Sequence, residues 1–379
     1  MDYAKIQSLI KKYGYDETFS QLLKKISEID FPVYAPVSTD EEALQMMKRI
    51  DKEYEPTFEN VPYKQVMQRK TNLIDFKFKN KYVSMFSAKF EEFDLFIAYF
   101  SGRCNMHARR YEMPGTPYEI WKNPEHRKRV LQFILKNKMG ITLQSLDNAN
   151  YTLAKACTYF RVTLMLNLII IFQPKSILDL CAGWGERLLG SIIKKVNYTG
   201  IDPSECMESV YKRIIKLTKT ENTAIVHKIG SENLDDVLKP TDKYDMVLFP
   251  PPYFDLEIYN NDPTQSINVY PDFDTWVERY LFVSIKLAWN HLVDGGHLIM
   301  YIGDYKNING EYTYTERTVL YACGFLDDCK YEGSIGRSSD RRKYYSFFCL
   351  KKDTSVSSED KKYYKDLYIK NYGNIKNPI

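Results

Sequence analysis

Two glycines, Gly183 and Gly185, follow a short apolar run at residues 177–180 and precede a stretch with helical periodicity. A second apolar run, farther along the chain, ends in Asp202. This order predicts a strand, a glycine turn, a helix and a second strand that ends in a carboxylate. At the edge of an open parallel sheet, such glycines let the backbone approach a ligand closely, and the carboxylate can accept hydrogen bonds from both hydroxyls of a ribose. The pattern therefore predicts a site for a nucleoside-bearing cofactor.

The glycine spacing alone leaves three interpretations open. A dinucleotide site requires a third small residue, but this chain has Leu188 at that position, and Trp184 would crowd a pyrophosphate. The stretch that begins at Asp179 and contains both glycines resembles motif I of class I S-adenosylmethionine-dependent methyltransferases. A turn with only a structural role is the third interpretation.

A second segment favours the methyltransferase interpretation. Pro250–Tyr253 directly follows an apolar run at residues 244–249, which predicts a buried strand with the prolines at its carboxyl end. The segment resembles motif IV of the amino-methyltransferases, (Asp/Asn/Ser)-Pro-Pro-(Tyr/Phe/Trp), which methylate exocyclic amines of adenine or cytosine. The resemblance covers about residues 159–350 and is similar in wording to a phage and giant-virus branch of that family.

The resemblance implies an α/β, Rossmann-like class I methyltransferase fold, with a mostly parallel sheet and a terminal antiparallel hairpin. It implies S-adenosyl-L-methionine as cofactor and methylation of an exocyclic base amine, with adenine N6 of DNA as the favoured target. Nucleic acid would be the partner, with DNA favoured over RNA, and a homodimer or a heteromeric partner is left open. The chain is rich in Lys, Asn, Ile and Tyr, which suits a virus-encoded protein.

Pro250 departs from the family pattern, which has Asp, Asn or Ser at this position. A ring-conjugated amine is a poor nucleophile, and acceptors aimed at its two N–H bonds make it attack. Proline has no side-chain acceptor, and losing one such hydrogen bond costs about 10²–10³ in rate. Three alternatives follow. The carbonyls of Pro250 and Pro251 suffice, Asp255 or Glu257 substitutes, or the protein binds cofactor without turnover and serves as a scaffold or nucleic-acid-binding subunit.

The resemblance also assigns roles to single residues. Asp179 would orient the glycine turn and the cofactor's amino group, Asp202 would hold the ribose, and Tyr253 would stack on an extruded base. The other expected cofactor contacts are Tyr159, Thr163, Cys181, Ala182, Gly183, Gly185, Ser231 and Glu232. The expected catalytic segment comprises Pro250, Pro251, Pro252, Tyr253 and Asp255. A buried structural thiol remains the alternative for Cys181, and a helix cap remains the alternative for Ser231 and Glu232.

Charge and composition limit the function classes. The 379 residues are 44% hydrophobic, enough for a sizeable core, and the net charge of only +4 excludes a polybasic nucleic-acid binder. Contact with phosphates would therefore come from local basic clusters. The candidates are Arg109 and Arg110 in one loop, and Arg337, Arg341, Arg342 and Lys343 in another. For each cluster a solvated surface is the alternative.

The sequence divides into three parts. Residues 1–140 form a mixed α+β N-terminal domain for target recognition or partner binding, residues 141–352 form the methyltransferase domain, and residues 353–379 form a polar, loosely attached tail. Seven cysteines occur singly without a C-x-x-C pair, which predicts no metal site and an intracellular, cytoplasmic, reducing compartment. We find no secretory signal and no apolar run of membrane-spanning length, so no membrane contact is expected.

Overall fold

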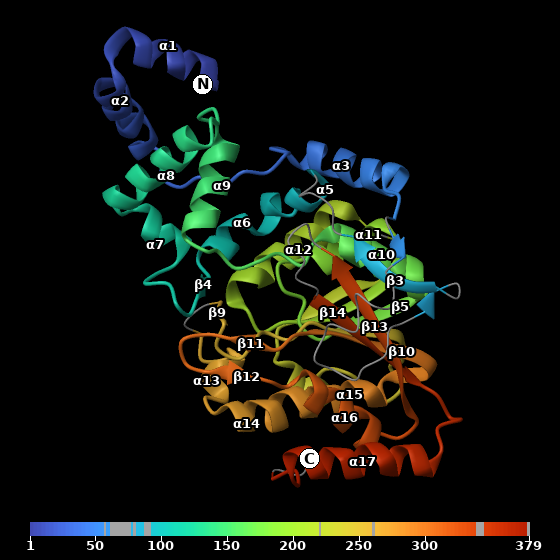
Figure 1. The fold of residues 1–379 in the computed structure, drawn as a ribbon. Helices are drawn as coiled ribbons and strands as arrows, with labels where there is room; N and C mark the ends of the chain where they lie inside the picture. Colours follow the sequence, from blue (N-terminus) through green and yellow to red (C-terminus); the bar gives the residue numbers. More distant parts are fainter. Residues whose placement is uncertain are drawn as a thin grey trace.

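The computed structural model describes residues 1–56, 58–60, 77–78, 81–86, 92–219, 221–259, 262–338 and 345–376. A single large sheet runs through the molecule in the order β1-β3-β13-β14-β10-β8-β5-β6-β7, and β2 pairs with β3 (Figure 1). Its strands are β1 (Phe58–Asn60), β2 (Lys77–Phe78), β3 (Lys81–Phe86), β5 (Ser176–Asp179), β6 (Asn197–Ile201), β7 (Ala224–His227), β8 (Tyr244–Phe249), β10 (Leu292–Ile302), β13 (Cys329–Ser338) and β14 (Tyr345–Lys352).

One half of the sheet is parallel and the other half is mixed. Strands β10, β8, β5, β6 and β7 run parallel to one another. Beyond β10, β14 is antiparallel to β10, β13 is antiparallel to β14, β3 is parallel to β13 and β1 is antiparallel to β3, so the N-terminal strands extend the same sheet. This confirms the Rossmann-like α/β fold with a mostly parallel sheet and a terminal antiparallel hairpin. From β5 the chain winds outward through β6 and β7 and then returns to β8 on the other side of β5. Strands β5 and β8 therefore flank the point where the winding direction switches, which is where ligands bind in such sheets.

The sheet is buried on both faces, and its strands alternate between two hydrophobic clusters. Met246 and Leu248 of β8 point into one cluster, while Val247 and Phe249 point into the other, and all four are fully buried. A continuous apolar run is the pattern expected of a strand covered on both faces. The first face carries α3 (Asp40–Glu53), α5 (Glu92–Leu95), α6 (Ala98–Met106), α10 (Val162–Phe172), α11 (Glu186–Ile193) and α12 (Glu205–Thr218).

The opposite face carries the short helices η1 (Ser231–Asp236) and η2 (Trp276–Leu281), and α13 (Ser266–Val269), α14 (Phe273–Thr275), α15 (Phe282–Asn290), α16 (Thr315–Phe325) and α17 (Ser358–Tyr372). A third hydrophobic cluster lies at the N-terminal end of the molecule (Figure 1). It joins α1 (Tyr3–Tyr13), α2 (Tyr15–Ser27), α7 (Pro117–Trp121), α8 (Pro124–Lys136) and α9 (Leu143–Leu153). The division at residue 140 stays a prediction. The packing groups α3, α5 and α6 with the central sheet and groups α9 with the N-terminal helices.

Two short strand pairs lie outside the large sheet. Strand β4 (Arg109–Arg110) pairs with β9 (Glu257–Ile258), so a loop of the N-terminal part joins the segment that follows the prolines. Strands β11 (Tyr305–Lys306) and β12 (Glu311–Tyr312) form a hairpin. Within the described ranges, no group of three His, Cys, Asp or Glu side chains is arranged to hold a metal ion. Among the helices of those ranges, none combines the length and apolar character needed to cross a membrane.

The cysteines are not all single. Cys104 of α6 and Cys206 of α12 form a disulfide across 102 positions of sequence. This corrects the expectation drawn from their spacing, because a pair so distant along the chain has no local sequence signal. The expectation of a reducing compartment rests on unpaired cysteines. Cys104 and Cys206 do not support that argument, because they are disulfide-bonded.

The C-terminal segment packs firmly instead of forming a loose tail. Helix α17 lies along α16 (Figure 1), and Tyr368 is fully buried between the rings of Phe282 and Phe325, at centroid distances of 6.2 Å and 5.2 Å. The Tyr368 hydroxyl accepts a hydrogen bond from Arg317 Nε at 3.3 Å. The expectation failed because the polar composition of the segment hides one aromatic stripe, formed by residues 364, 368 and 372 at helical spacing.

We expect Tyr368→Ala to lower the free energy of unfolding by roughly 3–5 kcal/mol, the cost of truncating a large buried aromatic side chain. Tyr363→Ala on the same helix is the matched control, because the Tyr363 side chain is 64% exposed. Urea unfolding followed by circular dichroism measures both variants. Equal midpoints for the two would show that α17 contributes little to the folded state.

Candidate active site

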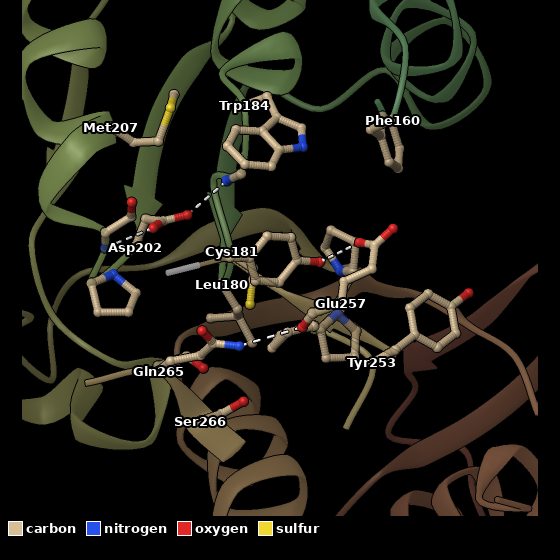
Figure 2. A pocket seen from close by; sticks show the side chains of 18 of the residues that line it. Phe160, Leu180, Cys181, Trp184, Asp202, Met207, Tyr253, Glu257, Gln265 and Ser266 are labelled. Carbon is tan, nitrogen blue, oxygen red and sulfur yellow. Dashed lines mark hydrogen bonds between the residues drawn. The ribbon is translucent and has the colours of Figure 1, made fainter. Parts of the chain in front are cut away.

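A pocket opens at the carboxyl ends of β5 and β8, at the switch point of the sheet. Figure 2 shows Asp202 and Met207 on one side of it and Glu257 and Tyr253 on the other, with Cys181 between them. Most lining residues come from the segments that follow four parallel strands, within 180–187, 202–207, 230–232 and 250–266. Residues 158–160, Tyr280 and Tyr301 complete the wall.

The glycine turn is fixed by a buried ion pair beneath it. Asp179, the last residue of β5, is fully buried, and its Oδ2 accepts hydrogen bonds from Arg187 Nε and from the Tyr198 hydroxyl, each at 2.7 Å. Its Oδ1 accepts from the backbone N–H of Cys181 at 3.3 Å, and Arg187 also donates to the carbonyl of Cys181. Asp179 thus orients the turn, as expected, but it does not line the pocket.

Asp202 lies where the sequence predicted it, at the carboxyl end of β6 and in the pocket wall. Its Oδ2 accepts from the backbone N–H of Gly183 at 2.8 Å and its Oδ1 from that of Ser204 at 3.0 Å. Burial raises the pKa of Asp202. A carboxylate has about four acceptor positions, so the two backbone bonds fix its orientation without using all of its acceptor capacity.

Gly183 lines the pocket, and only glycine fits there. Its φ is +60°, and an added Cβ would come within 2.9 Å of Arg187 Nη2. Gly185 has a φ of +93° and packs toward the helices behind the turn, so it shapes the turn without lining the pocket.

Ser231 and Glu232, two residues expected to contact the cofactor, follow β7 and line the pocket. Ser231 is buried, and its hydroxyl is hydrogen-bonded to that of Ser284 at 2.8 Å. Glu232 Oε2 is buried, and within the described part of the chain it has no hydrogen-bond partner, while burial raises the pKa of this carboxyl. A buried acceptor without a partner is costly and uncommon. Glu232 therefore fits a ligand that brings an N–H or O–H group to this edge.

Of the four other residues expected to contact the cofactor, two line the pocket and two do not. Tyr159 and Cys181 line the pocket, and the Cys181 sulfur lies 3.3 Å from the Tyr280 hydroxyl, with burial raising the pKa of the thiol. Ala182 is buried under the turn and does not line the pocket. Thr163 is also outside the pocket wall, because its hydroxyl donates to Asp94 at 2.8 Å and is held there.

The prolines and the tyrosine of the second motif, Pro250–Tyr253, all line the pocket as expected. Asp255 does not. Its two carboxylate oxygens accept four hydrogen bonds of 2.7–2.9 Å from the β11–β12 hairpin, donated by the side chains of Tyr305, Asn307, Asn309 and Tyr312. Asp255 therefore anchors that hairpin under the loop, and its carboxylate is in no position to replace the acceptor that Pro250 lacks.

Glu257 is the carboxylate that reaches the pocket beside the prolines. Its side chain is only 6% exposed, Oε2 accepts from the Tyr259 hydroxyl at 2.7 Å, and Oε1 accepts from the backbone N–H of Thr158 at 3.3 Å. Burial raises the pKa of Glu257, while the charge of Arg110 opposes that rise. Figure 2 shows Glu257 on the same side of the pocket as Tyr253.

The two basic clusters fall in different places. Arg109 and Arg110 form β4, where Arg110 is the register partner of Glu257, and Arg109 Nη1 donates to the carbonyls of Tyr111 and Met113 at 3.1 Å and 3.3 Å. Their position beside β9 makes them part of the pocket's surroundings. Of the second cluster, Arg337 lies in β13 by its backbone, and Arg341, Arg342 and Lys343 lie outside the described residues.

Several lining residues were not predicted from the sequence, most notably Glu186, Arg187, Tyr280 and Tyr301. Glu186 and Arg187 directly follow the second glycine of the turn, so their position next to the motif was a usable signal. Tyr280 and Tyr301 come from η2 and β10, far along the chain, and only the folded topology brings them to the pocket.

No family model matches the chain, and no curated protein matches it either. Among solved structures it is similar to the StiE O-MT, residues 942–1257, with 15% identity over 59% of this chain and 83% of that chain, and a TM-score of 0.37. It is also similar to the O-methyltransferase of the trans-AT PKS multienzyme of Brevibacillus brevis in complex with S-adenosyl-L-homocysteine (11% identity, 52% and 73% covered, TM-score 0.36). A third is TrmN from Thermus thermophilus (12% identity, 51% and 49% covered, TM-score 0.36). Likenesses this weak carry no conclusion about the chain's activity.

We expect Asp179→Asn to lower the free energy of unfolding by about 3–5 kcal/mol, because it leaves the Arg187 guanidinium buried without its counter-charge. Glu208→Gln is the control, since Glu208 of α12 makes surface ion pairs with Lys212 and Lys228, and losing them should leave the unfolding midpoint nearly unchanged. Urea denaturation measures both. If Asp179→Asn unfolds at the same midpoint as the native protein, the ion pair does not hold the turn.

Proposed function

We propose that this chain is an S-adenosylmethionine-dependent methyltransferase that acts on an exocyclic amine of a nucleic-acid base, with adenine N6 of DNA as the first candidate. The observation that carries the proposal is the shared pocket. One wall holds a glycine turn and Asp202, which suit a nucleoside, and the other holds Pro250–Tyr253 and Glu257, which suit an amine. The orphaned Glu232 Oε2 supports a ligand with N–H groups on the nucleoside side.

The bound cofactor would supply a methyl group on a sulfonium, ready for direct displacement. The chain's own part is to orient the amine and accept its hydrogens. The carbonyl groups of Pro250 and Pro251 accept one N–H, and the Glu257 carboxylate accepts the other, in place of the side chain that position 250 lacks. Tyr253 stacks on the base and holds its plane. Glu257 takes the proton that the amine loses after transfer.

The first experiment mixes the purified chain with methyl-labelled S-adenosylmethionine and unmethylated DNA or RNA, followed by digestion and identification of the labelled nucleoside. N6-methyladenine in DNA is the expected product. N4-methylcytosine would mean that the target base is cytosine, and a labelled RNA base would mean that the target polymer is RNA. If calorimetry detects cofactor binding but no label is transferred, the chain is a cofactor-binding scaffold or nucleic-acid-binding subunit. Absence of both would overturn the proposal.

We expect Glu257→Gln to lower the rate of transfer by about 10²–10³, because an amide accepts more weakly than a carboxylate and takes up no proton. Since burial raises the pKa of Glu257, the carboxylate takes up its proton at a higher pH than an ordinary glutamate. The native rate should therefore fall toward acid pH, beginning above the usual glutamate range, and Glu257→Gln should lose this acid limb. Glu332→Gln, which removes a carboxylate paired with His297 outside the pocket, is the control and should keep the native profile.

We expect Pro250→Ser alone to change the native rate little. Added to Glu257→Gln, it should raise the rate of that variant roughly tenfold or more, because serine returns an acceptor to the first position of the motif. Steady-state transfer assays on the two single variants and the double variant measure this. If the double variant transfers no faster than Glu257→Gln, then Glu257 acts on the fold of the loop and not on the amine.

A further inference from the structure

Glu186 is a buried carboxylate in the pocket that the function above does not use. It is the first residue of α11, it is fully buried, and it lines the pocket. Its Oε1 accepts a hydrogen bond from the backbone N–H of Phe160 at 2.9 Å. Its Oε2 is buried and has no hydrogen-bond partner within the part of the chain that the structure describes. The side chain is therefore fixed at one oxygen and unsatisfied at the other.

The neighbouring cation does not satisfy Glu186. The Arg187 guanidinium is bonded to Asp179 and to the carbonyl of Cys181, and no ion pair joins it to Glu186 among the described residues. Burial raises the pKa of Glu186, and the charge of Arg187 only partly opposes this. Keeping an unsatisfied carboxyl buried is costly. A positively charged hydrogen-bond donor at Oε2 would remove that cost.

A sulfonium carries three groups, and the function proposed above uses two of them. Asp202, Ser231 and Glu232, which follow β6 and β7, form the nucleoside wall, and Pro250–Tyr253, which follow β8, lie where the methyl group would be delivered. Phe160, Glu186 and Arg187 also line the pocket and have no part in that function. The remaining arm of the cofactor is a 3-amino-3-carboxypropyl chain, whose α-ammonium group requires an acceptor.

We propose that Glu186 binds the α-ammonium group of the cofactor's amino acid arm, the role that the sequence had assigned to Asp179. The inference rests on the proposed function, because it takes S-adenosylmethionine as the ligand. The ammonium donates to Oε2, and its charge stabilises the ionised carboxylate. Asp179 is excluded from this role because it is fully buried beneath the turn and outside the pocket wall.

The test measures binding without turnover. Titration calorimetry compares S-adenosylhomocysteine with its deaminated analogue, which lacks only the α-amino group, on the native protein and on Glu186→Gln. We expect the native protein to prefer S-adenosylhomocysteine by about 10–100-fold, the strength of a charge-assisted hydrogen bond. Glu186→Gln should lose most of this preference by binding S-adenosylhomocysteine more weakly, while its affinity for the deaminated analogue stays unchanged or rises.

Glu232→Gln is the matched control, because Glu232 is a second buried carboxylate of the same pocket with an unpartnered oxygen. It should weaken both compounds by the same factor, since it lies on the nucleoside wall. Equal binding of the two compounds by the native protein would overturn the role of Glu186 even if the variant fails to fold. A variant that weakens both equally would overturn it as well. If the native protein binds neither compound, the proposed function fails and this inference fails with it.

Discussion

The buried ion pair between Asp179 and Arg187 is the interaction on which the pocket depends. It joins the end of β5 to the first turn of α11, and Tyr198 adds β6 through its hydrogen bond to the same carboxylate. Such a pair gains little net stability over an apolar contact, but removing one partner is strongly destabilising. Its value is geometric, because it holds the backbone between strand and helix in one conformation. That conformation aims the N–H of Gly183 at Asp202.

Sheet topology then brings the second half of the site to the first. Strand β8 is the neighbour of β5, with Leu178 opposite Val247 and Asp179 opposite Leu248. The ladder continues one residue further, where the N–H of Leu180 donates to the carbonyl of Leu248 at 3.0 Å. The glycine turn and the proline segment therefore leave the sheet side by side. The glycine turn with Asp202 and the proline segment with Glu257 line one pocket because β5 and β8 flank the switch point.

Features with a local signal were predictable from the sequence, and features made by distant contacts were not. The parallel strands, the glycine turn, Asp202 and the proline segment each follow from an apolar run and the residues directly after it. The sequence alone could not show which of the two carboxylates after the prolines reaches the pocket. Asp255 and Glu257 lie two positions apart, but Asp255 is bound by a hairpin some 50 residues away, whereas Glu257 lies in β9, opposite Arg110 of β4. The packing of α17 and the Cys104–Cys206 disulfide likewise depend on partners far along the chain.

The proline segment of the pocket wall presents acceptors and no backbone donors, and this bears on the proposed substrate. Three consecutive prolines have no backbone N–H, so Pro250–Pro252 present only carbonyl groups. Two donors beside Glu257, the Tyr259 hydroxyl and the Thr158 N–H, are both bound to its carboxylate. Glu257 is itself only an acceptor when ionised. Under the proposed function, an amine with two N–H bonds would meet one acceptor on the proline segment and one on Glu257, whereas a substrate oxygen would find no donor on the prolines. Glu257, which lines the same pocket, would then supply the acceptor that position 250 lacks.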